Sequence, residues 1–190
     1  MPKISISIAN TLRNEIIEQK LPGKEFLSES ELAARFGVSK GPIKEAMHIL
    51  CQEGLLVGYP RRGYMVNTYS AEDYLQVTQL RRCIEKMCIE LTVQKAKDED
   101  LRQLKEELKG QVDADDMSPL KSNNTAFHMR LAELSGNTYA VGVLKRLLDI
   151  SAIGSIKMPT DNTIHEKILD AALKRDAAEA ARLLDEDIQC

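Results

Sequence analysis

The chain has 190 residues, of which 43% are hydrophobic and 29% charged, and its formal net charge is −3. This composition can build a hydrophobic core, excludes a disordered tail, and argues against a protein coated in basic residues. The sequence has no apolar run of about eighteen residues and no secretory signal, so we expect a cytoplasmic chain with no membrane partner. Its four cysteines do not have the spacing of a zinc finger, and we expect their thiols to be reduced.

The N-terminal region begins with two predicted helices. Apolar residues recur at every fourth position from Ile4, the spacing of an amphipathic helix, until the Leu-Pro-Gly at 21–23 interrupts the pattern. A short second helix is expected after Ser28, because Ser28 and Glu31 have the spacing of a capping box, and Gly37 is expected to end it.

A third helix and a β-hairpin are expected next. Ser39 is expected to cap the helix, with Pro42 in its first turn and Gly54 at its end. Its buried face is expected to consist of Ile43, Ala46, Met47, Leu50 and Cys51. Residues 55–59 and 63–69 are β-branched and aromatic runs on either side of a basic turn, which predicts a hairpin.

This order of elements predicts a winged helix-turn-helix. The N-terminal end of a helix presents free N–H groups and partial positive charge, and such a helix fits the major groove of DNA with its first turn against base edges. Arginines at the tip of the hairpin would reach phosphate or the minor groove. The residues expected to contact double-stranded DNA are Ser39, Lys40, Gly41, Lys44, Arg61, Arg62 and Gly63.

Glycine and proline cluster at 54–63 and are sparse afterwards, which places a domain boundary near Thr68 to Ala71. We therefore expect a DNA-binding domain at 1–68 and an all-helical domain at 69–190. About six helices are expected in the second domain, arranged as an antiparallel bundle in a mainly α protein. The first of them is expected to bury an apolar side formed by Leu75, Leu80, Ile84, Met87, Cys88 and Leu91.

The stretch LSESELAARFGVSKGPIKEAMHILCQEGLLVGYPRRGYMV resembles the DNA-binding domain of the GntR superfamily of bacterial transcription regulators. The resemblance covers residues 5–67 and implies a regulator, most often a repressor, that acts as a homodimer on an inverted-repeat operator. The family commonly has arginine where this chain has Lys40 and Lys44, and threonine where it has Gly41. Lysine lacks the forked contact that arginine makes with guanine, so the operator sequence does not carry over.

Three segments of the second domain resemble the ligand-sensing FCD domain of the FadR-like branch of this superfamily: LRRCIEK, FHMRLAELSGN and HEKILDAALKRDAAEAARLL. The resemblance implies a divalent metal (Zn, Ni or Mn) and a small carboxylate effector that completes its shell. The four ligand positions are Asn124, His128, His165 and Asp187. Only the two histidines match the family, which has aspartate at the first position and histidine at the last.

Two questions stay open about this second domain. The histidines are either metal ligands or core residues hydrogen-bonded to Asn124 and Asp187 without a metal. The resemblance makes an arginine of the first helix the contact for the effector carboxylate, and Arg81 is the candidate, because a bidentate fork suits that role. The alternative is a surface pair of Arg81 with Glu85, four residues on, with Arg82 solvated.

Two other functions compete with a ligand-responsive repressor. The bundle is short between His128 and His165, so one alternative is a helical domain that only dimerises and senses nothing. A helical metalloenzyme with an accessory winged domain is the other. His165-Glu166 begins like a zinc-protease motif, but Leu169 occupies the position of the second histidine, and no enzyme is expected.

Overall fold

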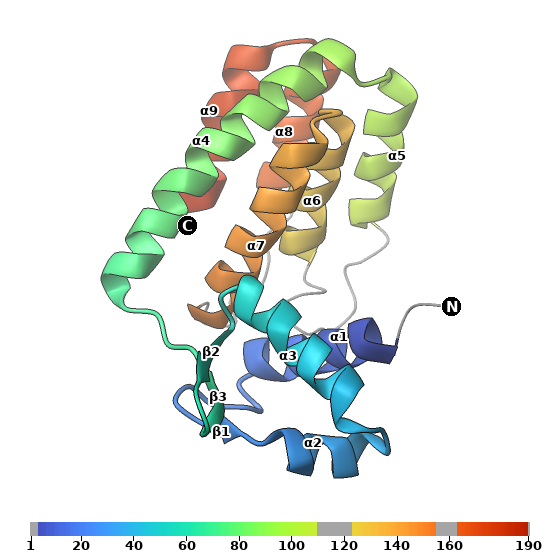
Figure 1. Ribbon diagram of the computed structural model, residues 1–190. Coiled ribbons are helices and arrows are strands. Elements are labelled where there is room, and N and C mark those ends of the chain that lie inside the picture. Colours follow the sequence, from blue (N-terminus) through green and yellow to red (C-terminus); the bar gives the residue numbers. More distant parts are fainter. Residues whose placement is uncertain (1–3, 110–122, 155–162, 190) are drawn as a thin grey trace. The chain divides into compact units, whose positions relative to one another are not determined.

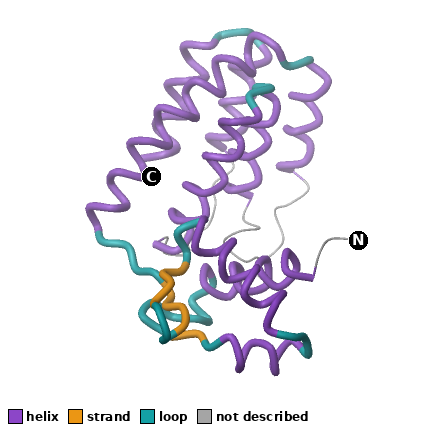
Figure 2. Tube along the Cα trace, viewed as in Figure 1, coloured by secondary structure: helices purple, strands orange, loops and turns teal. Residues whose placement is uncertain are grey.

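The computed structural model describes residues 4–109, 123–154 and 163–189, and the chain divides into two compact units, Met1–Ser70 and Ala71–Cys190 (Figure 1). Helices dominate both units, and strands occur only in the first among the described residues (Figure 2). Within these residues no helix is long and apolar enough to cross a membrane.

The first unit combines three helices with a small sheet, in the order α1 (Ile4–Ile17), β1 (Phe26–Leu27), α2 (Glu29–Phe36), α3 (Lys40–Gln52), β2 (Leu56–Tyr59) and β3 (Gly63–Val66). The antiparallel sheet has the order β1-β3-β2. The predicted winged helix-turn-helix is confirmed. Helix α1 packs against α3, and the core is formed by apolar side chains of all three helices and the sheet, including Leu12, Leu32, Ile43, Met47, Leu50 and Val66.

The predicted cap residues stand at the ends of α2 and at the start of α3, but only Ser28 makes a capping hydrogen bond through its side chain. Ser28 Oγ accepts a hydrogen bond from Glu31 N at 3.4 Å, and Gly37 ends α2 in a left-handed conformation with φ of 64°. Ser39 stands at the N-terminal cap of α3 in an extended conformation, but its side chain makes no capping hydrogen bond. A cap side chain accepts from the second or third helical N–H. Ser39 therefore takes the predicted cap position, and Pro42, the third helical residue, has no N–H to donate to its side chain.

The second unit is a helical bundle, as predicted. Its helices are α4 (Ala71–Lys95), α5 (Asp98–Lys109), α6 (Asn123–Leu134), α7 (Thr138–Gly154), α8 (Thr163–Leu173) and α9 (Ala177–Gln189). Helix α4 packs against α6, α7 and α9, and α8 packs against α9 and α5. The start expected for the third bundle helix, at Ser118-Pro119, lies outside the described residues.

The buried face of α4 differs from the predicted one. Leu75, Leu80 and Met87 are 53%, 47% and 38% exposed, so the prediction that they are buried is wrong. The side of α4 that meets the bundle is defined by Arg81, Glu85, Cys88, Ile89, Thr92 and Val93. Two charged residues therefore take core positions in place of the leucines, and the leucines lie on the surface of the unit.

Candidate functional site

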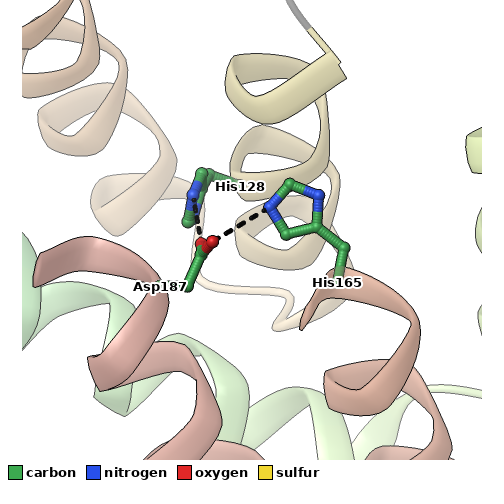
Figure 3. A group of neighbouring side chains, drawn as sticks. All are labelled: His128, His165 and Asp187. Atoms are coloured by element: carbon green, nitrogen blue, oxygen red, sulfur yellow. Dashed lines mark ion pairs between the residues drawn. The ribbon is translucent and has the colours of Figure 1, made fainter. Parts of the chain in front are cut away.

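Four side chains from three helices of the second unit converge at one point. Helix α6 supplies Asn124 and His128, which share a face because they are one turn apart. Helix α8 supplies His165 and α9 supplies Asp187, and Figure 3 shows both imidazoles directed at the Asp187 carboxylate. The predicted metal-ligand set is thus brought together from positions far apart in the chain.

The ring nitrogens and oxygens meet within a few ångströms. The Nε2 atoms of His128 and His165 lie 3.0 and 3.1 Å from the same atom, Asn124 Oδ1. They also lie 3.0 Å and 3.3 Å from the two oxygens of Asp187. One ligand atom each of His128, His165 and Asp187 fall within 4.8 Å of one another. Imidazole nitrogens with carboxylate and amide oxygens are a donor set suited to Zn²⁺, Ni²⁺ or Mn²⁺.

The donor atoms of the cluster are compatible with a bound cation. Asp187 Oδ2 is buried without a hydrogen-bond partner among the described residues, although His128 Nε2 is 3.0 Å away. The distance suits a hydrogen bond and the direction does not. Buried polar atoms normally have a partner, so an oxygen in this condition is consistent with a ligand that a metal ion would satisfy.

A carboxylate outside the predicted set lies beside the cluster. Glu85 on α4 forms an ion pair with His128 Nδ1 through Oε2, and its Oε1 accepts a hydrogen bond from Arg81 Nε at 2.8 Å. The Arg81 and Glu85 side chains are 10% and 3% exposed, so this pair has the predicted four-residue spacing but is not on the surface. Glu85 is not among the residues predicted for the site, although it lies one turn after Arg81 inside the matching LRRCIEK segment.

The charges of these groups reinforce one another. Burial lowers the pKa of His128, but the Glu85 carboxylate and the contact with Asp187 outweigh burial and raise the pKa to about 9. Burial raises the pKa of Glu85, and the charges of His128 and Arg81 lower it by more. Burial likewise raises the pKa of Asp187, and its contacts with His128 and His165 lower it well below the usual range. The three pKa shifts favour a protonated His128 and ionised Glu85 and Asp187 carboxylates.

Arg82 has a different environment from its neighbour Arg81. Its side chain is 40% exposed and forms a two-pronged ion pair with Asp185 on α9, through contacts of 2.5 and 2.6 Å. The alternative in which Arg82 is merely solvated is wrong in this respect, because Arg82 is paired with Asp185. Because Asp185 is two residues before Asp187, this pair ties the part of α9 that carries Asp187 to α4.

The residues predicted to contact DNA lie on the surface of the first unit, at two places. Ser39, Lys40, Gly41 and Lys44 occupy the N-terminal end and outer face of α3. Arg61 and Arg62 lie in the turn between β2 and β3, and Gly63 is the first residue of β3. Two details fix the shape of this turn. The guanidinium of Arg62 lies 5.1 Å from the centre of the Phe26 ring, and Gly63 has φ of 96°.

Comparison with known proteins matches each unit to a domain of known type. The model of the bacterial regulatory proteins of the gntR family matches residues 5–66, and that of the FCD domain matches residues 76–189. The uncharacterized HTH-type transcriptional regulator YdhC of Bacillus subtilis (strain 168) is 30% identical over 145 residues, which are 74% of this chain and 65% of YdhC. This chain thus spans less than two-thirds of YdhC.

Two further proteins are similar over more of their length. The HTH-type transcriptional repressor NanR of Cronobacter sakazakii is 30% identical over 205 residues, covering 90% of this chain and 78% of NanR. The solved structure of Escherichia coli McbR/YncC has a TM-score of 0.83 at 19% identity and covers 100% of this chain and 95% of that chain. The structural likeness supports the fold, and the sequence matches support the family.

Proposed function

This chain belongs to the gntR family of bacterial regulatory proteins and carries an FCD domain, and on that premise we propose that it is a cytoplasmic, sequence-specific DNA-binding repressor controlled by a small organic acid and a divalent metal. Members of this family regulate transcription, so the metalloenzyme alternative is set aside. The domain limits we propose are 1–68 for the DNA-binding head and 69–190 for the helical sensor.

The proposed DNA contacts rest on the exposure of one helix end. Lys40 and Lys44 lie one turn apart on the outer face of α3, while Ile43 and Met47 of the same helix are buried in the core. The helix is thus fixed to the unit on one side and presents two cations and its free N–H groups on the other. At the same end of α3, Ser39 offers a hydroxyl group to the DNA, and Gly41 has no side chain to keep the backbone away from it. Arg61, Arg62 and Gly63 are the proposed contacts of the wing.

We propose that the protein is a homodimer and binds an inverted repeat, with one recognition helix per half-site. Helices α4 and α7 pack against each other, and each also carries large apolar side chains on its exposed surface. The exposed residues are Leu80 and Met87 on α4 and Tyr139 and Val143 on α7. Exposed apolar side chains grouped on neighbouring helices are typical of a surface that a second subunit covers.

Asn124, His128, His165 and Asp187 are the residues proposed to hold the metal. Their donor atoms already face one another, and the Asp187 oxygen without a hydrogen-bond partner supports this assignment. A bound Zn²⁺, Ni²⁺ or Mn²⁺ would supply a positive centre that attracts a carboxylate. The effector would thereby be chosen for its negative charge and small size.

Arg81 is the proposed partner of the effector carboxylate. Its Nε already donates to Glu85, and the remaining guanidinium N–H groups belong to the two terminal nitrogens. A planar pair of such donors matches the two oxygens of a carboxylate. Effector binding would then act on α4, α6, α8 and α9 together, which is the physical route by which it would bias the equilibrium between DNA-binding states.

The single observation that carries the proposal is the joint match of both domain models, and DNA selection tests it. The full chain is incubated with a random double-stranded library, and bound DNA is amplified and sequenced. An inverted repeat with half-sites about one helical turn apart is the expected result. Recovery of unrelated sequences with the affinity of the starting library would contradict the proposal.

Effector control is tested on the selected operator. Small mono- and dicarboxylates are added to the protein–DNA complex, once with Zn²⁺-loaded protein and once with chelator-stripped protein. We expect an acid that changes operator affinity about 5- to 150-fold, the usual range of allosteric coupling, and only with the metal-loaded protein. An operator that binds equally under all conditions would favour the alternative in which the helical domain only dimerises.

A further inference from the structure

Glu85 joins the candidate metal site to a buried arginine. Its two carboxylate oxygens have different partners: Oε2 forms the ion pair with His128 Nδ1, and Oε1 accepts the hydrogen bond from Arg81 Nε at 2.8 Å. A buried carboxylate is costly unless a cation compensates it, and Arg81 supplies that cation from one turn earlier on α4. Glu85 is therefore held with one oxygen directed at a ligand histidine.

The nitrogen that Glu85 contacts is the one that a metal would leave unused. A histidine binds a metal through an unprotonated ring nitrogen, and the partner of the other nitrogen selects which one that is. In His128 the nitrogen facing Asn124 and Asp187 is Nε2. A carboxylate at Nδ1 keeps the proton there, orients the ring and makes Nε2 a stronger donor.

The second histidine provides an internal contrast. His165 also directs Nε2 at Asn124 and Asp187. The Nδ1 atoms of both rings are buried without a directed hydrogen bond among the described residues, but only that of His128 is in ion-pair contact with a carboxylate. Its ring instead stacks on Phe127, with centroids 4.0 Å apart and an angle of 19° between the planes. The two imidazoles are thus oriented by different means, and only His128 has a carboxylate behind it.

We propose that Glu85 is a positioning residue of the metal site, held by Arg81, that fixes His128 with Nε2 toward the ion and so sets the affinity for a divalent metal. This inference rests on the proposed metal site and adds to it a residue outside the ligand set. It also gives Arg81 a second role, because the group that would receive an effector carboxylate is the group that holds Glu85.

The test compares the Zn²⁺ affinity of Glu85→Gln and Glu90→Gln with that of the wild-type full chain, by competition with a chromophoric chelator. Glutamine keeps the size of Glu85 and removes the charge that retains the Nδ1 proton. We expect the affinity of Glu85→Gln to fall about 10- to 100-fold, as is usual when a residue that orients a metal ligand is replaced. Glu90 lies on the same helix and forms no ion pair with His128 in the described structure, so its variant should bind like wild type.

A second measurement on the wild-type protein needs no variant. Long-range ¹H–¹⁵N spectra of the Zn²⁺-loaded chain should show His128 protonated at Nδ1 and coordinated through Nε2. Coordination through Nδ1 would overturn the proposal even if Glu85→Gln failed to fold. Equal affinities of Glu85→Gln and wild type would overturn the role of Glu85 and leave the metal site standing. A wild-type chain that binds no Zn²⁺ would overturn both.

Discussion

His128 Nε2 and Asp187 Oδ2 lie 3.0 Å apart with side chains 1% and 9% exposed, yet Asp187 Oδ2 has no hydrogen-bond partner among the described residues. The two groups attract each other as an ion pair, but without a directed hydrogen bond the buried oxygen keeps part of its desolvation cost. A metal ion between them would be bound by both, and its binding free energy would be added to the stability of the helical unit.

Zn²⁺, Ni²⁺ or Mn²⁺ is therefore expected to raise the Tm of chelator-stripped protein. At about one hundred times its Kd, a ligand of the native state adds roughly 2.7 kcal/mol. For a chain of this size the midpoint should rise by roughly 5–10 °C. Differential scanning calorimetry measures the shift in the wild type and in the double variant Asn124→Ala, His165→Ala. The shift should disappear in the double variant. The control is His48→Ala, an exposed histidine on α3 that should keep the full shift.

The metal-free protein should become less stable as the pH rises above neutrality. The folded-state pKa of His128 is raised to about 9, above its unfolded value of about 6.5. The stabilisation is therefore fully present below pH 6.5 and is lost as the pH rises through 9. The loss is on the order of 3 kcal/mol at most. Urea denaturation at several pH values checks this, with His128→Gln as the control that should lack the decline. A rise in stability over the same interval would contradict the prediction.

The resemblance to the FCD domain named four positions that the structure brings together, and whether they bind a metal stays a prediction. Asn124 and His128 are one turn apart, and His165 and Asp187 are placed by the matching segments around them. Once the bundle forms, the four positions have to meet. Which atoms face inward was not predictable, because it depends on side-chain rotamers and on the carboxylate of Glu85.

The buried face of α4 was predicted incorrectly for a physical reason. Periodicity assigns leucines to the core, but a helix with apolar residues on more than one side leaves the choice of buried face to tertiary packing. In α4 the buried face includes Arg81 and Glu85, and Leu80 is on the surface. Ser39 takes the predicted cap position of α3, but its side chain makes no capping hydrogen bond, and Pro42 removes one of the two N–H groups it could bind.

Replacing both lysines of the α3 surface should abolish specific DNA binding without unfolding the protein. Lys40 and Lys44 are exposed, so Lys40→Ala, Lys44→Ala removes two charges and leaves the core intact. Removing one lysine–phosphate interaction reduces the slope of log K against log salt by about 1, and removing one interaction with a base costs about 1–3 kcal/mol. Fluorescence anisotropy over a salt series measures both, and circular dichroism confirms the fold.

The matched control for this pair is Lys95→Ala, Lys97→Ala, which removes two exposed lysines from the helical unit. Its operator affinity and salt slope should equal those of wild type. Unchanged operator affinity in the α3 pair would show that the recognition helix is wrongly assigned.

Gly63→Ala should weaken the wing through its backbone. Gly63 has φ of 96°, and a Cβ there would lie 2.8 Å from the carbonyl oxygen of Leu27. Since β3 pairs with β1 beside this point, the strain falls on the sheet, and we expect the free energy of unfolding to fall by about 1–3 kcal/mol.

Gly41→Ala should have the opposite effect. A Cβ at Gly41 would meet only Ser39 Oγ, at 4.0 Å, and an alanine in this helix should raise the free energy of unfolding by about 0.4–1 kcal/mol. Urea denaturation that ranks the two variants in the reverse order would refute this account.

Charges placed on the exposed apolar side chains of α4 and α7 should separate the proposed dimer. Leu80 and Val143 are 47% and 46% exposed, so glutamate at both positions is tolerated by the folded monomer. In a dimer that covers them, the same carboxylates would be buried without partners, which disfavours association. Sedimentation velocity should show a monomer for Leu80→Glu, Val143→Glu. The control Ile4→Glu charges an apolar residue of the first unit that is 59% exposed, and it should remain dimeric.

The proposed dimer also has a consequence for operator affinity. In a dimer, binding of one DNA-binding domain to its half-site holds the second domain close to the other half-site. Monomers bind each half-site independently and lose this effective-concentration gain in affinity, which is about 10²- to 10⁴-fold. The Leu80→Glu, Val143→Glu variant should therefore bind a full operator only as tightly as wild type binds a single half-site. If it sediments as a dimer and keeps full operator affinity, the subunits meet through another surface. If it is monomeric yet keeps that affinity, the operator does not require two heads.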